Sequence, residues 1–192
     1  MSLYDFEAAK KILAARLSPA RYQHSLGVSQ MAAELAQIYG QDCEKSAFVG
    51  LVHDITKNVD QTQQYELLKR YGVPITPPLQ YSPAVLHSIT GAYLARAQFG
   101  IDEQMFRAIL YHTTGHRGMG RFEMILFVAD LIEPSRVFPD VESLREKAKT
   151  DIDAVALEKV RFSILSNVKK GLYLHPDTLD LYNEFSEKRY SK

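Results

Sequence analysis

The stretch PARYQHSLGVSQMAAELAQIYG, residues 19–40, decides the fold class of this chain. Its proline stands where it can open a helix, and its glycine stands where a helix can end in the left-handed conformation. Between them a stripe repeats every three or four residues, which predicts a helix with one face toward a core. The members of the stripe are His24, Val28, Met31, Leu35 and Ile38. The histidine is therefore expected to point into the core.

The same order of start signal, apolar stripe and stop recurs along the chain. The helices expected from it cover residues 4–17, 19–40, 42–54, 60–72, 82–100, 102–112, 121–133, 140–149, 151–170 and 177–188. The proline-rich segment from Val73 to Pro83 is expected to be the longest irregular connection and to line or cover a site. No window alternates like a strand between hairpin turns, so we predict an all-α bundle of about ten helices.

The composition suits a single globular domain. The chain has 192 residues, of which 46% are apolar and 24% charged, and no linker or repeat divides it. We expect one domain over residues 1–192. Its core is expected over about residues 20–140, and helices over residues 140–192 are expected to complete the site.

Charge and length exclude several classes of partner. Lysine plus arginine and aspartate plus glutamate number 23 each, so no nucleic-acid partner is expected. The longest apolar stretch, Ile125 to Ala129, is far shorter than the ~20 residues of a membrane span, so no membrane partner is expected either. The single cysteine and an N-terminus without a secretory pattern predict a cytoplasmic location. The zero net charge leaves a homodimer open.

Six side chains of the types that bind metals lie on the apolar stripes or at helix ends. They are His24, His53, Asp54, His87, His112 and Asp130. Each alone has an ordinary explanation: a packed core histidine, a histidine bonded to the last carbonyls of a helix, or a salt bridge from Asp130 to an arginine. Together they favour a mono- or binuclear metal site, because imidazoles with carboxylates suit Zn, Mn or Fe, and helical bundles hold such ligands in their cores.

The order of these residues resembles that of the HD-domain phosphohydrolases. Further motifs tighten the match: HDITK at 53–57, LHSITGAYLA at 86–95, HTTG at 112–115, VADLIEPSR at 128–136 and HPDTLDLYN at 175–183. Together they resemble the YqeK family, bacterial HD enzymes that hydrolyse diadenosine tetraphosphate symmetrically to two ADP. The resemblance covers about residues 20–185. The HD-x-x-E-D string of alarmone enzymes and the GYP signature of cyclic-dinucleotide hydrolases are absent.

The resemblance implies a ligand set and a cofactor. His24, His53, Asp54 and Asp130 would hold the first metal, which is iron in the resembled family, while Mn or Zn fits the same residue types. His87 and His112 would complete a second metal site or bind phosphate directly. The residues expected to be catalytic are Asp54, Lys57, His87 and His112.

The resemblance also implies a small-molecule partner, a dinucleoside polyphosphate with ADP as product. Its expected contacts are Ile55, Thr56, Lys57, His87, His112, Thr113, Arg136, Tyr173, Leu174, His175, Pro176, Asp177 and Thr178. Of these, Lys57 and Arg136 would neutralise phosphate, and residues 173–178 would frame a nucleoside. Three residues around the GHRGMG segment, His116, Arg117 and Arg121, are expected to be solvated, and the segment is expected to be flexible.

Three alternatives stay open at this point. Another HD phosphohydrolase would act on a nucleotide mono- or triphosphate. A di-iron HD oxygenase would consume dioxygen, although it has no need of the basic residues Lys57 and Arg136. A non-catalytic module would sense a nucleotide or hold a structural metal.

Overall fold

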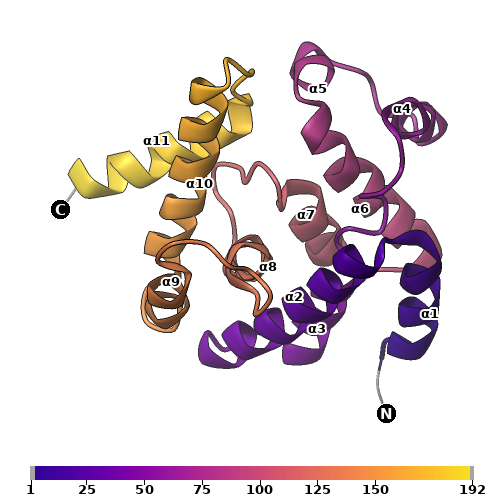
Figure 1. The fold of residues 1–192 in the computed structure, drawn as a ribbon, viewed down its shortest axis with the longest axis horizontal. Coiled ribbons are helices and arrows are strands. Elements are labelled where there is room, and N and C mark those ends of the chain that lie inside the picture. Colours follow the sequence, from indigo (N-terminus) through magenta and orange to yellow (C-terminus); the bar gives the residue numbers. More distant parts are fainter. Residues whose placement is uncertain (1–2, 191–192) are drawn as a thin grey trace.

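The computed structural model describes residues 3–190, and this part of the chain is helical with no strand (Figure 1). The α-helices are α1 (Phe6–Arg16), α2 (Pro19–Ile38), α3 (Cys43–Val52), α4 (Gln61–Arg70), α5 (Pro77–Tyr81), α6 (Leu86–Phe99), α7 (Glu103–Tyr111), α8 (Arg121–Ile132), α9 (Val141–Ala148), α10 (Ile152–Lys169) and α11 (Pro176–Tyr190). A 3₁₀ helix, η1 (Pro83–Val85), precedes α6. The all-α prediction is confirmed. The domain extent of 1–192 stays a prediction.

Local signals place most helix ends where the sequence predicted them. The side chains of Asp42, Asp60 and Asp102 accept hydrogen bonds from the first turns of α3, α4 and α7. Pro19 opens α2, and Gly40 follows it with a φ of 64°. These helices therefore begin and end through contacts within a few residues.

Three local expectations were wrong. The proline-rich connection contains α5, because Pro77 at its first position already has the φ that a helix needs. Helix α3 ends at Val52, so His53 and Asp54 lie in the tight turns that follow it. Ile38, at the end of the first stripe, is 48% exposed, because a stripe of 3.5-residue spacing drifts about 20° around a helix every seven residues.

Two glycines allow the backbone of the core to approach closely. Helix α2 lies along α3, and a Cβ on Gly50 would lie 2.9 Å from Ser29 Cα. Helix α6 lies against the turn after α3, where a Cβ on Gly91 would lie 3.2 Å from the His53 carbonyl oxygen. The close contact at Gly91 brings α6 to the segment that carries His53 and Asp54.

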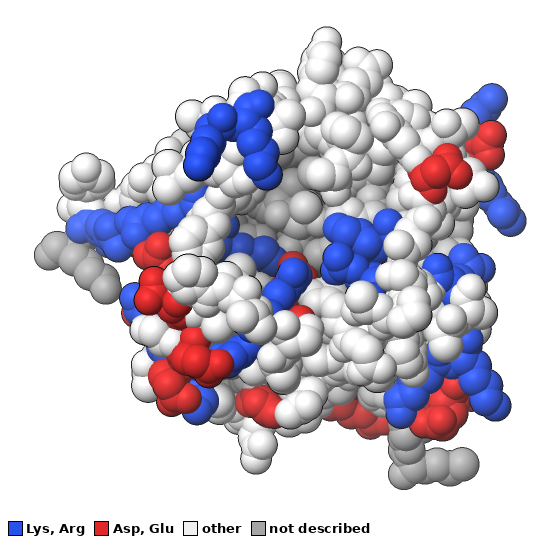
Figure 2. All heavy atoms as spheres, viewed as in Figure 1, with Lys and Arg blue, Asp and Glu red and all other residues white. Residues whose placement is uncertain are grey.

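The outer helices leave a hollow on one face. The buried residues of α10 all lie in the first half of this helix. The second half of α10 lies beside α11 on one side of the molecule (Figure 1). Helices α5 and α6 stand on the other side. The space-filling view shows a hollow between these sides with lysine and arginine side chains around it (Figure 2). Within residues 3–190, no helix has the length and apolar content to cross a bilayer.

Candidate metal centre

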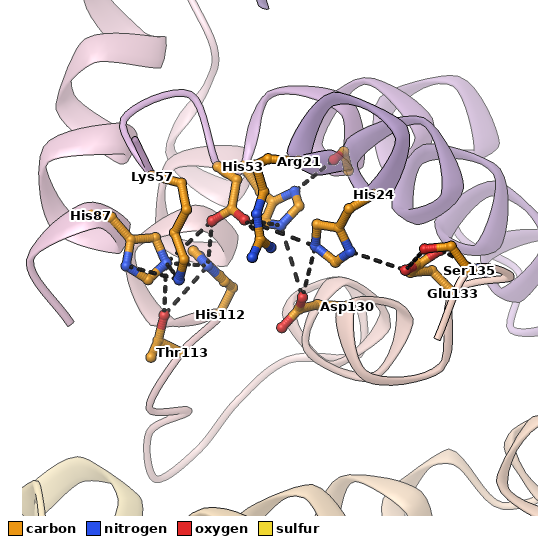
Figure 3. A network of polar contacts seen from close by, with 12 residues as sticks. Arg21, His24, His53, Lys57, His87, His112, Thr113, Asp130, Glu133 and Ser135 are labelled. Atoms are coloured by element: carbon orange, nitrogen blue, oxygen red, sulfur yellow. Dashed lines mark hydrogen bonds and ion pairs between the residues drawn. The ribbon is translucent and has the colours of Figure 1, made fainter. Parts of the chain in front are cut away.

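The six predicted ligand side chains converge in the structure, and we call them the ligand cluster (Figure 3). The cluster contains two groups, one of His24, His53 and Asp54 and one of Asp54, His87 and His112. Within each group the ligand atoms lie within 4.8 Å of one another, and every member is buried. Asp130 joins the first group, with Oδ1 3.1 Å from His24 Nε2 and 4.0 Å from His53 Nε2.

Asp54 divides its two carboxylate oxygens between the two groups. Its Oδ2 lies 3.5 Å from His53 Nε2 and 3.8 Å from His24 Nε2. Its Oδ1 lies 3.2 Å from His87 Nε2 and 3.5 Å from His112 Nε2. A carboxylate in this position has one oxygen available to each of two neighbouring cations.

Hydrogen bonds on the outer side of three histidine rings orient them. His53 Nδ1 donates to the Gly50 carbonyl at 2.7 Å, and His112 Nδ1 donates to the Ile109 carbonyl at 2.7 Å. His24 Nδ1 lies 3.1 Å from Glu133 Oε1 and donates to it. Because a carbonyl or carboxylate oxygen only accepts, Nδ1 carries the proton in each ring. Each Nε2 is then directed into the cluster, as in the histidine ligands of metal proteins.

The inner atoms of the cluster lack the partners that burial demands. His24 Nε2, His53 Nε2 and Asp54 Oδ1 are buried and make no hydrogen bond. Buried polar atoms without partners cost free energy, and imidazole lone pairs that face carboxylate oxygens repel them. A divalent cation between these atoms removes both costs, and the N/O donor set suits a transition metal. The residues present therefore fit a metal.

The charges in the cluster also favour a cation. Burial raises the pKa of Asp54, but the charge of His53 outweighs it and the pKa lies well below its usual range. Burial opposes protonation of His53, yet the charges of Asp54 and Asp130 raise its pKa overall. Burial lowers the pKa of His112 to about 3, so this ring is neutral near pH 7. Ionised carboxylates beside a neutral imidazole are in the forms that bind a metal.

Asp130 is held by two basic side chains. Arg136 Nη2 lies 3.0 Å from its Oδ1, so the salt bridge to an arginine exists alongside the contact with His24. Lys159 Nζ lies 2.8 Å from its Oδ2 and also donates to the Phe127 carbonyl at 2.7 Å. The charge of Lys159 lowers the pKa of Asp130 well below its usual range, against the effect of burial.

Sequence reasoning missed three residues of this site. Lys159 projects from α10, and its only signal was a lysine among the apolar residues of that helix. Glu133 is fully buried beside His24, and its signal was a carboxylate directly after the apolar run of α8. Arg21 Nη1 lies 2.9 Å from Asp54 Oδ2, and its position one helical turn before His24 was a usable signal.

A polar cavity of about 660 Å³ opens beside the first group. Its lining includes His24 and the basic side chains Arg21, Lys57 and Arg136. Lys57 Nζ also lies 3.1 Å from His87 Nε2, and burial lowers its pKa. Three basic groups next to the ligand cluster can neutralise several phosphate charges.

The other predicted substrate contacts lie in different surroundings. Thr113 Oγ1 is 3.3 Å from His112 Nε2, at the second group. The side chains of Ile55 and Thr56 are buried, and the Thr56 hydroxyl donates to the His87 carbonyl, so both hold the turn that carries Lys57. The Thr178 hydroxyl donates to the Thr114 carbonyl.

A second, apolar cavity of about 410 Å³ is lined by residues from α5, α6, α7 and the start of α11. His175, Pro176 and Asp177 line it at one edge, next to Tyr173 and Leu174 in the chain. Ile89, two residues after His87, and Thr114, two residues after His112, line it as well. The polar cavity thus borders the ligand cluster directly, through His24, and the apolar cavity is lined by segments that also carry cluster residues.

The expectation that His116 is solvated was wrong. Its side chain is 12% exposed, with Nε2 3.1 Å from Glu123 Oε2 and 3.1 Å from Arg107 Nη2. Arg117 forms an ion pair with Glu187, and the Gly118 amide donates to Glu184 at 2.6 Å. The GHRGMG segment is therefore attached to both α8 and α11. The expectation was wrong because the partners of this segment, on α8 and α11, cannot be recognised from its local composition.

Comparison with known proteins agrees with this geometry. The HD domain family matches residues 21–156, a range that contains every member of the ligand cluster. The chain belongs to the HD domain family.

Several known proteins are similar to this HD-family chain over nearly its whole length. It is 38% identical over 177 residues to the “Bis(5'-nucleosyl)-tetraphosphatase, symmetrical” of Halalkalibacterium halodurans, covering 92% of this chain and 94% of that protein. The Bacillus subtilis protein of the same name is 34% identical over 178 residues, covering 92% and 95%. The crystal structure of a predicted HD superfamily hydrolase involved in NAD metabolism, from Clostridium acetobutylicum, has a TM-score of 0.92 at 34% identity, covering 96% and 98%.

Proposed function

We propose that this HD-family protein is a metal-dependent symmetrical bis(5'-nucleosyl)-tetraphosphatase that hydrolyses diadenosine tetraphosphate to two ADP. The observation that carries the proposal is the division of Asp54 between two histidine groups beside a cavity with three basic side chains. The activity named for the relatives at 38% and 34% identity supports the substrate. Another HD phosphohydrolase, a di-iron oxygenase and a non-catalytic module are the alternatives that the experiment below distinguishes.

We assign the first metal to His24, His53, Asp54 and Asp130, with iron as the expected ion and Mn or Zn as substitutes. His87 and His112 lie close enough to Asp54 Oδ1 to serve a second ion or a phosphate oxygen. A bound cation would supply a water of lowered pKa and neutralise phosphate charge. The ligand assignment rests on the unpartnered inner atoms of the cluster.

In the reaction, the oxygen of water forms a bond to one of the two central phosphorus atoms, and the proton that the water loses passes to solvent. The bridging oxygen then leaves with the other phosphorus, and both halves depart as ADP. Asp54, with its low pKa, accepts a hydrogen bond and orients the water rather than acting as a strong base. Lys57 and Arg21, both within reach of the cluster, neutralise the charge that grows on the departing phosphate.

The two cavities suggest how the substrate lies. The polyphosphate chain occupies the polar cavity at Arg21, Lys57 and Arg136, although part of the Arg136 head is already paired with Asp130. Thr113 adds a hydroxyl for phosphate at the second group. One nucleoside enters the apolar cavity and is framed by residues 173–178. The single cysteine agrees with a cytoplasmic location, and a homodimer stays a prediction.

The test incubates the purified protein with diadenosine tetraphosphate and separates ADP, AMP and ATP by chromatography. We expect ADP as sole product, loss of activity on chelation and recovery with iron(II) or manganese(II). Asp54→Asn should lower kcat at least ~1000-fold, which corresponds to about 4 kcal/mol of transition-state stabilisation. AMP plus ATP as products, oxygen uptake, or nucleotide binding without turnover would each contradict the proposal and favour one of the alternatives.

A further inference from the structure

Two exposed tyrosines meet across the molecule. Tyr81 ends α5, and Tyr173 lies in the connection between α10 and α11; these two segments face each other in Figure 1. Their ring centroids are 5.6 Å apart with the planes tilted by 37°. Tyr81 is 63% exposed and Tyr173 38%. This ring contact, which we call the tyrosine pair, is therefore close to solvent and not part of the core.

The tyrosine pair joins two segments that line the apolar cavity, which we call its two edges. One edge is formed by Pro74, Pro78 and Leu79, in the segment that leads to Tyr81. The other edge includes His175 and Pro176, in the segment that follows Tyr173. The contact between the rings thus lies where these two segments approach each other.

Two segments that line the same cavity also carry members of the ligand cluster. Ile89 and Thr114 line the cavity, and each is two residues from a histidine of the second group. Tyr93 and Leu110 add apolar surface beside them. A nucleobase held in this cavity would therefore lie against the segments that carry His87 and His112.

We infer that Tyr81 is a base-binding residue, and that the tyrosine pair parts to stack one purine of the substrate between the two edges of the apolar cavity. This inference rests on the proposed function and adds a residue from α5 to the nucleoside site. Stacking of a base on an aromatic side chain contributes roughly 5- to 150-fold in affinity. The contact between two exposed rings stabilises the protein by less than base stacking stabilises the complex. Replacing the ring–ring contact by ring–base contacts is therefore favourable for binding.

The first experiment compares Tyr81→Ala with Tyr81→Phe in the metal-loaded enzyme. The alanine variant should raise KM for diadenosine tetraphosphate at least ~5-fold and leave kcat within about twofold, because the ring contacts a base far from the reacting phosphorus atoms. The phenylalanine variant keeps the ring and should behave like the wild type. An unchanged KM in Tyr81→Ala would overturn the inference while the proposed function stands.

The second experiment needs no turnover and uses the absence of tryptophan from the sequence. Tyr81→Trp creates a single fluorescent reporter at the cavity edge. Titration with ADP should change its emission saturably, whereas pyrophosphate, which has no base, should not. Tyr190→Trp, at a residue that is 92% exposed near the end of α11, is the matched control and should respond to neither.

The outcomes separate the two proposals. An equal response of Tyr81→Trp to ADP and pyrophosphate, or no response to ADP, would overturn the role of Tyr81. A wild-type enzyme that does not cleave diadenosine tetraphosphate would contradict the proposed function. In that case the ADP titration still decides whether Tyr81 stacks on a base.

Discussion

His24 shows how single residues prepare the metal centre. One ring nitrogen donates to Glu133 at 3.1 Å, and the other faces Asp130 at 3.1 Å. Glu133 is itself held by the Ser135 amide at 2.7 Å and by the Ser135 hydroxyl at 2.5 Å. The chain of contacts fixes the tautomer of His24, so the ring presents a lone pair to a cation without reorganisation.

We expect Glu133→Ala to weaken metal binding about 10- to 100-fold, because His24 loses the acceptor that orients its ring. Glu133→Gln keeps an acceptor oxygen and should lose less. Metal titration of the chelated protein measures both affinities. Glu7→Ala, at a residue whose side chain is 76% exposed, is the control and should bind metal normally. Wild-type affinity in Glu133→Ala would show that this contact does not prepare the ligand.

At the scale of elements, Glu123 in the first turn of α8 joins this helix to the middle of α7. Its Oε1 lies 2.8 Å from Arg107 Nε, and its Oε2 lies 3.1 Å from His116 Nε2 and 2.8 Å from the Gly120 amide. The carboxylate thus ties α7, the GHRGMG segment and the first turn of α8 together. Because His112 directly follows α7, this attachment also steadies one side of the ligand cluster.

The stability that Glu123 supplies should depend on pH. Burial raises its pKa, but the hydrogen bond with His116 and the charge of Arg107 outweigh burial, and the pKa lies below its usual value. A depressed pKa means that the ionised form stabilises the native state above the unfolded pKa of about 4.3, and that this stabilisation is lost as the pH falls through the folded pKa.

We therefore expect Glu123→Gln to lower the free energy of unfolding by about 1–3 kcal/mol at pH 7, and the difference from wild type to shrink below pH ~4. Urea denaturation at several pH values measures this difference. Glu103→Gln removes an ion pair of an exposed side chain with Arg96 and should change stability by less than about 1 kcal/mol. A pH-independent deficit in Glu123→Gln would mean that the charge of Glu123 is not the stabilising feature.

At the scale of the whole molecule, the ligand cluster draws its side chains from α2, the turn after α3, α6, α7 and α8 (Figure 3). Lys159 adds α10 to the same network through Asp130. A cation at this junction contacts elements that pack against one another throughout the core, so its binding energy contributes to the stability of the entire fold.

Chelation should therefore lower the Tm by about 5–15 °C, since a ligand at 100- to 1000-fold above its Kd adds about 3–4 kcal/mol and each kcal/mol shifts a domain of this size by about 2–4 °C. Circular dichroism at 222 nm follows the transition with and without added iron(II) or manganese(II). The Asp54→Asn variant, which lacks the shared ligand, should show a smaller shift. Equal Tm values for the loaded and chelated wild type would contradict a metal in the core.

The sequence by itself determined the elements and the ligand types. Caps such as Asp42, Asp60 and Asp102 and the prolines and glycines at helix ends act through hydrogen bonds and backbone angles within a few residues, so they can be predicted locally. The candidate ligands His24, His53, Asp54 and Asp130 stood out because charged and polar side chains on apolar stripes need a shared explanation, and the resemblance to HD-domain proteins supplied their order.

Only the tertiary structure decided which partners these residues meet. Lys159 reaches Asp130 from α10, Glu133 reaches His24 across 109 residues, and Tyr81 meets Tyr173. Local patterns fix how a helix begins, ends and faces a core, but they carry no information on which other helix covers that face. Those contacts depend on the packing of the whole core, where close approaches such as those at Gly50 and Gly91 set the positions of the helices.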